Sequence, residues 1–399
     1  MQAHILESLN LFVRWAHVIA GIMWVGDSFL FMWLDRQLEP TTRVSGAPEQ
    51  VAGEMWMVHS GGFYEVIKRK YLVEGEMPKS LHWFKWESYT TWITGACLLV
   101  IVYYFGGGAF LVDPTAAPLA TGPTIAIAVA AIVAAWFLYD FVAHMAWAKN
   151  LRVFGVVGVA AMVAISYGFS QLMTGRAAYV HTGALIGTIM AANVFFRIIP
   201  AQRALLAATH AGGKPDVSLG IRAKLRSTHN HYLTLPLLFM MLSNHFPATY
   251  GNSHSWLVLA ALIIFGIAMK QLMIEREHPR AWLIGAMVLS LAAVVVVTAP
   301  TTDRAELPTG PPVPFAQVRA IVDARCLGCH SNKPTTGGFV APPLGIVFEQ
   351  NAALVAMAPR IQVRVVDTKT MPLGNLTGMT DAERRVVALW LAQGAKLDP

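Results

Sequence analysis

The sequence is poor in cysteine and in charged residues. It has 3 cysteines among 399 residues, and Cys97 lies in an apolar run far from the other two, which excludes a disulfide scaffold. Only 13% of the residues are charged, well below the roughly 25% that soluble domains carry. The net charge is +7, but the basic residues form no single patch, so we expect no nucleic-acid partner.

The two remaining cysteines lie in one motif, Cys326-Leu-Gly-Cys329-His330. This spacing allows both thiols to add to the vinyl groups of one haem c, and it places His330 beneath the iron as an axial ligand. A zinc knuckle would need two further Cys or His ligands close by, and a thioredoxin-like redox pair would need a βαβ context. The motif therefore predicts a covalent haem c in a protein that handles electrons.

The apolar residues gather in runs of about twenty, the length that crosses a bilayer. These runs predict an all-α fold, a polytopic membrane helix bundle of eight transmembrane helices. The C-x-x-C-H motif and the length of the segment after the last run predict that a C-terminal class I cytochrome c domain follows. The first run lacks a small-residue cleavage site and is interpreted as a retained helix. The sixth is short and contains Pro236. The predicted spans are residues 9–34, 89–105, 124–147, 153–173, 178–199, 232–246, 256–274 and 281–299.

Basic residues alternate from loop to loop, and this alternation predicts the orientation. The segments after spans one, three, five and seven hold the basic residues, whereas those after spans two, four and six contain only Arg176. We expect a multi-pass protein of the bacterial inner membrane with its N-terminus in the periplasm. Because the number of spans is even, the C-terminus and the haem motif are also expected in the periplasm, where bacteria attach c-type haem.

Three segments are predicted. Residues 1–300 form the membrane domain, with a long inner loop at 35–88; residues 301–314 form a linker; and residues 315–399 form the periplasmic cytochrome c domain. One amphipathic helix runs from Phe315 into Cys326, and another runs from Asp381 to Gln393 with Thr380 as its N-cap.

A methionine is the expected sixth ligand when a haem only relays electrons. Met371 is the best candidate because it lies in a loop before the final helix, from which its side chain can reach across the haem. Met357 and Met379 fit a packing role better.

Ionisable side chains inside the predicted spans mark candidate functional positions, because they are costly in a bilayer. Arg14 and His17 share one face of the first span. Histidines on facing helices could hold a second haem or a metal ion, and the candidates are His17, His144, His181 and His245. Near the outer face, Asn244 is a further polar position. The polar positions near the inner face are Asp27, Asp140, Asn193, Arg197, His229, Asn230 and His231.

Several of these positions have a second interpretation. Arg197, His229 and His231 lie at span ends, where they could contact lipid headgroups. Asp140 and His144 could equally form a structural pair between helices.

The inner loop is rich in aromatic residues, which argues against disorder. His82 and Lys85, with His59 and Glu87, are candidates for substrate binding or proton transfer. Trp83 and Trp86 fit better as anchors at the membrane surface.

Four stretches resemble the membrane-bound bacterial urate oxidases, also called urate hydroxylases. They are residues 15–24 (WAHVIAGIMW), 77–95 (MPKSLHWFKWESYTTWITG), 229–236 (HNHYLTLP) and 241–247 (MLSNHFP). That family joins an eight-span domain to a C-terminal cytochrome c, an arrangement that covers essentially this whole chain. The resemblance implies oxidation of urate to 5-hydroxyisourate with water as the oxygen source, and electrons passed to cytochrome c rather than directly to O2. A soluble cytochrome c or a terminal oxidase would be the onward acceptor.

A flat, anionic, acceptor-rich substrate favours arginine, whose planar guanidinium can stack and form paired hydrogen bonds. The sequence leaves two locations open. Near the outer face the candidates are Arg14 and His17, with Asn244 and His245; near the inner face they are His82 and Lys85, with Arg197 and His229.

The haem position bears on this choice. If the periplasmic haem is the sole cofactor, the substrate should bind near the outer face, because roughly 30 Å of hydrocarbon is too far for one tunnelling step. A site reached from the inner side, which we favour, calls for a second redox centre. The alternative is a membrane module that passes electrons from quinol to cytochrome c without urate chemistry. A fused haem–copper oxidase would need a denser set of paired histidines.

Overall fold

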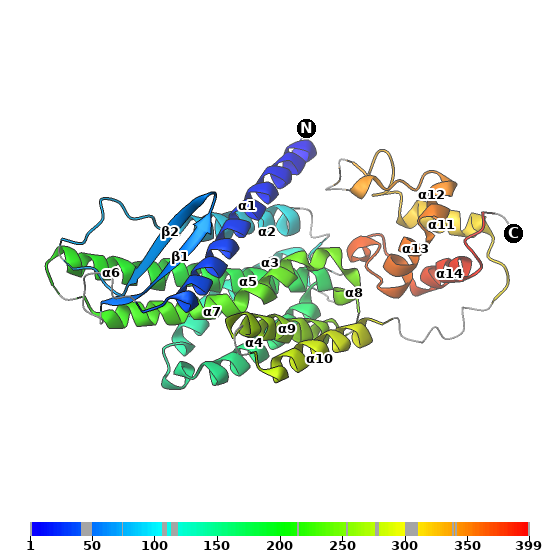
Figure 1. Ribbon diagram of the computed structural model, residues 1–399. Helices are drawn as coiled ribbons and strands as arrows, with labels where there is room; N and C mark the ends of the chain where they lie inside the picture. Colours follow the sequence, from blue (N-terminus) through cyan, green and yellow to red (C-terminus); the bar gives the residue numbers. More distant parts are fainter. Residues whose placement is uncertain are drawn as a thin grey trace.

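The computed structural model describes residues 2–40, 50–73, 75–105, 110–112, 119–213, 215–252, 254–275, 279–299, 310–336, 339 and 341–397. The chain forms an elongated helical bundle and a smaller C-terminal module (Figure 1). The long helices of the bundle are α1 (Gln2–Gln37), α2 (Trp86–Leu99), α3 (Thr121–Val142), α4 (Leu151–Leu172), α5 (Gly175–Asn193), α6 (Ile199–His210), α7 (Val217–Leu242), α9 (Ser255–Ile274) and α10 (Ala281–Thr298). Short turns join some of them: η1 (Val100–Tyr104), η2 (Ala146–Lys149), η3 (Val194–Ile198), η4 (Ser243–His245) and α8 (Pro247–Tyr250).

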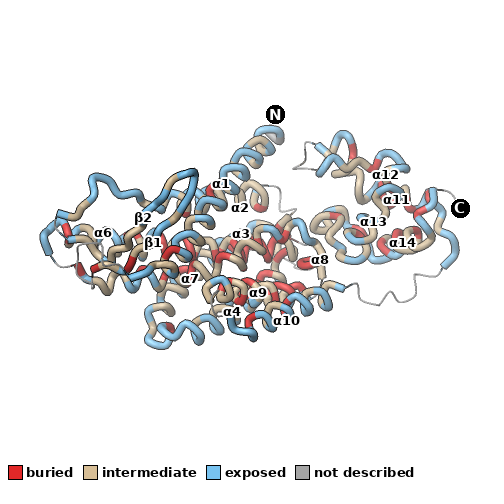
Figure 2. The backbone as a smooth tube through the Cα atoms, in the orientation of Figure 1, coloured by how far each residue is buried: buried red, intermediate tan, exposed pale blue. Residues whose placement is uncertain are grey.

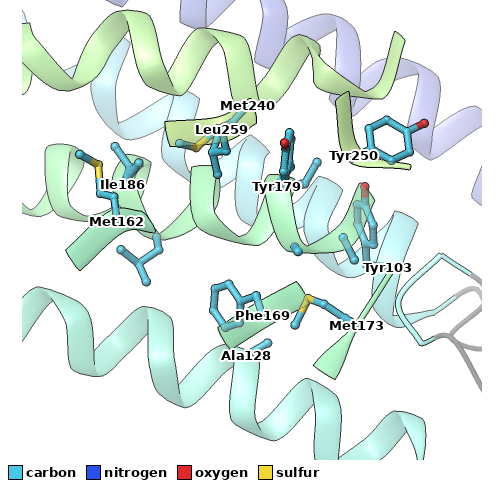
Figure 3. Packing of buried hydrophobic residues seen from close by; sticks show 14 of the residues in the cluster. Tyr103, Ala128, Met162, Phe169, Met173, Tyr179, Ile186, Met240, Tyr250 and Leu259 are labelled. Carbon is cyan, nitrogen blue, oxygen red and sulfur yellow. The ribbon is translucent and has the colours of Figure 1, made fainter. Parts of the chain in front are cut away.

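Helix α5 runs through the centre of the bundle and packs against α2, α3, α4 and α7. Most of its residues are buried, and many of them are Gly, Ala or Thr. An added Cβ at Gly183 would lie 2.8 Å from Met241 Cε and 3.1 Å from Met240 Cβ, so the close approach of α7 requires glycine there. Figure 3 shows part of the apolar core around α5, to which Tyr179 and Phe169 contribute.

The outer helices turn apolar side chains away from the bundle, as the exposed colouring of α1 and α10 indicates (Figure 2). Phe12, Phe137 and Val296 are examples, and soluble proteins rarely expose so much contiguous apolar surface. Among the described residues, 6 helical stretches are long and apolar enough to cross a membrane: His4–Gln37, Thr121–Val142, Leu151–Leu172, Gly175–His210, Ser255–Ile274 and Ala281–Thr298. These stretches coincide with six of the predicted spans, and their length and composition suggest a membrane protein.

The predicted spans 89–105 and 232–246 form helices, but neither is among those 6. The first is divided into α2, of 14 residues, and the π-helical turn η1. The second is the apolar half of α7, whose other half carries Arg222, Lys224 and Arg226. Both helices contact α5, so they lie against the centre of the bundle.

Residues 50–73 of the predicted inner loop correct the all-α prediction. Strands β1 (Val51–His59) and β2 (Gly62–Arg69) form an antiparallel hairpin. Ser60 and Gly61 form its two-residue turn, and both have positive φ, at 50° and 77°, as a type I′ turn requires. The prediction missed the hairpin because the aromatic residues of this segment also fit membrane anchors.

The two ends of the bundle differ (Figure 1). At one end, which we call the hairpin end, Lys68 of β2 forms an ion pair with Asp35 of α1, and Thr209 of α6 donates to the carbonyl of Leu72 at 2.9 Å. At the other, which we call the module end, Phe110 and Phe339 of the C-terminal module have ring centroids 6.4 Å apart.

The C-terminal module has its own core. It contains α11 (Phe315–Arg325), α12 (Asn351–Ala356), α13 (Ala358–Ile361), η6 (Gln362–Asp367) and α14 (Asp381–Ala392), with short turns η5 (Pro343–Gly345) and η7 (Leu373–Asn375). Val318 and Trp390 are almost fully buried, at 1% and 2% exposure. Both predicted amphipathic helices are confirmed. Of the predicted linker, 301–314, only residues from 310 onward are described.

Helix α14 begins with a capping box that also ties it to α11. The Glu383 amide donates to Thr380 Oγ1 at 3.2 Å, and the Thr380 amide donates to Glu383 Oε2 at 2.7 Å. Arg325 Nε donates to Glu383 Oε1 at 3.0 Å. Burial alone would raise the pKa of Glu383, but the Thr380 amide and the Arg325 guanidinium together hold it below its usual value.

A depressed carboxyl pKa stabilises the folded state above the unfolded value of 4.5, and this stabilisation is lost as the pH falls through the folded pKa. We therefore expect acidification below this value to weaken α14. Glu383→Gln should cost about 1 kcal/mol at neutral pH and flatten the pH dependence. Amide hydrogen exchange of α14 in the full chain, corrected for intrinsic rates, measures both effects. Asp381→Asn is the comparison: it removes an exposed carboxylate whose pKa is also lowered, chiefly by its hydrogen bond with Lys369, so it should flatten the pH dependence less than Glu383→Gln does. Equal pH dependence in the Glu383→Gln variant and the unaltered protein would contradict the assignment.

Candidate functional site

Asp140, near the end of α3, forms ion pairs with two arginines from other helices. Its carboxylate accepts from Arg197 Nε at 2.9 Å and also from Arg197 Nη2, and it accepts from Arg226 Nη2 at 2.8 Å. His144 Nδ1 lies 2.6 Å from the Asp140 carbonyl oxygen, so this nitrogen carries the proton. The predicted pair of Asp140 and His144 is thus one part of a larger charged cluster at the hairpin end.

A second network adjoins this cluster and fixes the proton positions on a histidine. Asn193 Nδ2 donates to Tyr139 Oη at 2.9 Å and to Asn230 Oδ1 at 2.9 Å. Tyr139 Oη lies 2.8 Å from His229 Nδ1, and this nitrogen is the acceptor for the phenolic hydrogen. The neutral imidazole then carries its hydrogen on Nε2. Phe154 stacks on this ring, with centroids 4.4 Å apart.

Three buried polar atoms in these networks have no hydrogen-bond partner among the described residues: His229 Nε2, Arg226 Nη1 and Asn193 Oδ1. We call them the open groups. His229 is 5% exposed, Arg226 is 6% exposed and Asn193 is fully buried. Burying such groups without a hydrogen-bond partner costs free energy. Arg226 Nη1 and His229 Nε2 are hydrogen-bond donors, and Asn193 Oδ1 is an acceptor.

The open groups and the charged cluster lie side by side. Arg226 joins them, because it bonds Asp140 and its guanidinium lies 5.1 Å from the Tyr139 ring centroid. A cavity of about 420 Å³ opens at the charged cluster; its lining residues are Phe137, Asp140, Phe141, His144, Met145 and Arg197, and the open groups lie behind this lining rather than in it. Two guanidinium groups, an imidazole N–H and an amide oxygen suit a planar anion that both accepts and donates hydrogen bonds.

The predicted candidates Arg14 and His17 lie elsewhere, in the module half of α1. Arg14 is exposed, and its Nη2 donates to Asn10 Oδ1 at 2.9 Å. His17 is half-buried against α2, with Nδ1 3.0 Å from both the Thr91 carbonyl oxygen and Thr94 Oγ1. An added Cβ at Gly95 would lie 3.0 Å from the His17 ring, so helix packing accounts for this histidine's position.

The histidines proposed for a second centre are not brought together. His181 is fully buried in α5, whereas His144 is exposed at the hairpin end and His245 is exposed in η4. Asn244, beside His245, accepts from Arg176 Nε at 2.8 Å. In the part of the chain that the structure describes, no group of three or more His, Cys, Asp or Glu side chains could hold a metal ion.

The inner-loop candidates lie on the surface of the hairpin end. His82 is exposed and packs edge-on against Phe84, with centroids 4.6 Å apart. Lys85 Nζ lies 5.8 Å from the Trp83 ring and 5.7 Å from the Trp86 ring, an arrangement typical of cation–π contacts. The structure brings neither residue into contact with the open groups.

The C-x-x-C-H motif fits a haem. Cys326 and Cys329 are both free, and burial raises the pKa of the Cys326 thiol to about 11. His330 Nδ1 lies 3.0 Å from the Ile346 carbonyl oxygen, so it carries the proton and leaves Nε2 free to ligate iron. Burial lowers the pKa of His330, which favours the neutral, ligating form. Leu344 is 91% exposed and provides apolar surface that a haem could cover.

The predicted iron ligand Met371 is half-buried in the loop before α14, where its carbonyl accepts from Arg384 Nη1 at 2.7 Å. Met379 is 4% exposed in the module core, and Met357 packs against that core. The packing role predicted for these two methionines is confirmed.

Sequence reasoning missed Arg226, Tyr139 and Phe154. Arg226 precedes His229 by three residues on α7, so helical spacing places both on one face. This spacing could have identified Arg226 as a neighbour of the candidate His229. Tyr139 and Phe154 carried no comparable signal, because aromatic residues are common throughout the spans.

Asp140→Asn tests the charged cluster. Arg226 is 7% exposed at its side chain, and without the carboxylate its buried charge loses its partner. We expect a loss of about 3–5 kcal/mol in stability, the usual cost of breaking a buried pair. Thermal unfolding in detergent measures it. The double variant Asp140→Asn/Arg226→Met should recover part of the loss, whereas an unchanged unfolding temperature for Asp140→Asn would contradict the role of the cluster.

Comparisons with known proteins bear on the whole bundle. Searches of curated proteins and of solved structures found no match. The urate oxidase N-terminal family matches residues 3–299, which cover the bundle and both groups of polar residues described above. The chain belongs to the urate oxidase N-terminal family.

Proposed function

We propose that the protein oxidises urate to 5-hydroxyisourate and passes the electrons to a haem c in its C-terminal module. The observation that carries the proposal is the set of open groups, one of which belongs to Arg226, beside the charged cluster of Asp140 and Arg197, in a chain of the urate oxidase N-terminal family. Urate is planar, anionic at neutral pH and rich in carbonyl oxygens and ring N–H groups.

The open groups match this substrate. Arg226 Nη1 and His229 Nε2 donate to urate oxygens, and Asn193 Oδ1 accepts from a ring N–H. Phe154 holds the plane of the imidazole by stacking on it. Because all three groups are already buried, they bind without paying the cost of desolvation at the moment of binding.

The reaction adds one water to urate and releases two electrons and two protons. His144 lines the cavity, and because its Nδ1 donates to the Asp140 carbonyl, its Nε2 is free to take a proton. We assign His144 as the general base that activates water. Asp140 holds Arg197 and Arg226 in place and remains ionised between them.

The membrane arrangement follows the loop charges. The bundle crosses the bacterial inner membrane eight times, α2 and α7 included, with the hairpin end in the cytoplasm and both termini in the periplasm. Cys326 and Cys329 would attach the haem, and His330 and Met371 would ligate its iron. Haem c supplies one-electron redox chemistry when bound, and a soluble cytochrome c or a terminal oxidase is the onward acceptor.

Anaerobic mixing of urate with the oxidised full-length protein tests the function. Haem c should become reduced, and product analysis should give 5-hydroxyisourate without hydrogen peroxide. Arg226→Gln removes a charged hydrogen bond worth about 1.5–3 kcal/mol, so the urate concentration for half-maximal reduction should rise at least ten-fold. Arg222→Gln, an exposed arginine one turn earlier on α7, is the control and should behave as the unaltered protein.

The outcomes separate the two functional classes. If urate leaves the haem oxidised while a quinol reduces it, the protein is an electron-transfer module. If urate reduces the haem but Arg226→Gln equals Arg222→Gln, urate oxidation stands and the assigned binding site is wrong.

Met371→Ala tests the haem ligand. The oxidised protein should lose the weak far-red absorption band that methionine ligation of iron produces, and its haem potential should fall. Met379→Ala removes a methionine of the same module that is buried in the core, so it should lower stability and keep the band. Absorption spectra of both oxidised variants measure the band. If the band survives in Met371→Ala, another residue is the sixth ligand of the iron.

A further inference from the structure

Two arginines at the module end of the bundle have no carboxylate partner. Arg14 lies in the module half of α1, and Arg176 lies in the first turn of α5. The two guanidinium groups are close enough to repel each other, and among the described residues neither forms an ion pair. Like charges held near each other without a counter-charge cost free energy, so an anion that binds to both would be stabilised.

Both guanidinium groups keep hydrogen-bond donors available. Arg14 Nε and Nη2 donate to Asn10 Oδ1 at 3.2 and 2.9 Å, which leaves Nη1. Arg176 Nε donates to Asn244 Oδ1 at 2.8 Å, which leaves Nη1 and Nη2. Phe110 covers one face of Arg176, with the guanidinium carbon 4.5 Å from the ring centroid. The orientation of Arg176 is therefore set by its neighbours, and its two terminal nitrogens can bind a ligand.

Tyr103 adds a hydroxyl group to these donors. It is 3% exposed, and its ring centroid lies 6.3 Å from that of Phe110. Arg176 lies close to the hydroxyl, but no hydrogen bond of normal geometry joins them, and the oxygen has no other partner among the described residues. A buried hydroxyl without a partner is costly, so a ligand that accepts its hydrogen would remove this cost.

The three residues lie at one level of the predicted membrane. Tyr103 is near the end of the second predicted span, Arg176 just precedes the fifth, and Arg14 lies about 8 Å inside the first at the usual helical rise. Arginine side chains this near the end of a span can reach the lipid headgroups. The site therefore lies where headgroup phosphates are expected.

Exposed apolar side chains continue from Arg14 toward the middle of α1. Val18 and Ile22 follow Arg14 by four and eight residues, so helical spacing places them on its face. They are 51% and 68% exposed. An exposed cation above an exposed apolar stripe matches a phosphate headgroup above acyl chains. Urate has no apolar part that could cover the stripe, so this surface favours a phospholipid over a small anion.

We propose that Arg14, Arg176 and Tyr103 bind the phosphate of an anionic phospholipid in the membrane leaflet at the module end. The phosphate oxygens accept hydrogen bonds from the free guanidinium nitrogens and from the Tyr103 hydroxyl, and an acyl chain covers Val18 and Ile22. The first turn of α5 adds the positive end of a helix dipole. Phosphatidylcholine binds more weakly, because the arginines repel its quaternary ammonium group.

Titration of the full-length protein in neutral detergent with phosphatidylglycerol tests the site, and native mass spectrometry counts the lipid molecules retained. The unaltered protein should retain one phosphatidylglycerol. Arg14→Gln should raise the lipid concentration for half occupancy about five-fold, the usual effect of one basic residue near a membrane surface. Arg14→Gln/Arg176→Gln should raise it about twenty-five-fold. Tyr103→Phe, which removes only the hydroxyl, should raise it about five-fold.

Arg222→Gln is the matched control, because it removes an exposed arginine from α7 at the hairpin end. It should leave the concentration for half occupancy unchanged. Arg14 is exposed and bonds only Asn10, one turn earlier, so Arg14→Gln should fold as the unaltered protein does. Equal unfolding temperatures in detergent without lipid check this.

Equal lipid affinities of Arg14→Gln and Arg222→Gln would overturn the site, and so would equal binding of phosphatidylcholine and phosphatidylglycerol. Inorganic phosphate and urate serve as competitors. If either displaces the lipid at equal concentration, the arginines bind a small anion and the assignment to a phospholipid is wrong. The test needs no turnover, so a failure of the proposed urate oxidation would leave its result unchanged.

Discussion

The packing of four helices around α5 is the constraint on which the rest of the bundle depends. Its small residues allow α7 to approach closely at Gly183, where any larger residue would meet Met240 and Met241. Because α2, α3, α4 and α7 all contact this one helix, residues far apart in the sequence can share its polar positions. Asn193 thereby reaches Tyr139 and Asn230, and His181 reaches Tyr104.

The interior of the bundle offers little water, so each buried polar group must find its partner within the protein. That requirement is what determines proton positions here: the Ala177 carbonyl determines the hydrogen on His181, and the Tyr139 hydroxyl donates to Nδ1 of His229. The same requirement makes the open groups informative. Their cost is understandable if a ligand completes them, and the family of the chain points to urate as that ligand.

The bundle and the C-terminal module differ in how they encode their sites. In the module, the C-x-x-C-H motif is five consecutive residues, and α14 starts where Thr380 and Glu383 form a capping box. Local patterns of this kind can be recognised without a structure, because neighbours in sequence make the contacts. In the bundle, the candidate site draws on α3, α4, α5 and α7, and its geometry depends on how these helices pack.

The sequence by itself determined six helices that are long and apolar enough to cross a membrane, the amphipathic helices of the module and the packing role of Met379, because hydrophobic runs and helical periodicity are local properties. It also singled out Asp140, Asn193, Arg197 and His229 as costly in a membrane. Only the tertiary structure decided that these residues meet Arg226, Tyr139 and Phe154, and that His17 and His245 remain apart from them. It also decided that the inner loop forms a hairpin. Such contacts depend on which helix faces are opposed, and no spacing within a single helix carries that information.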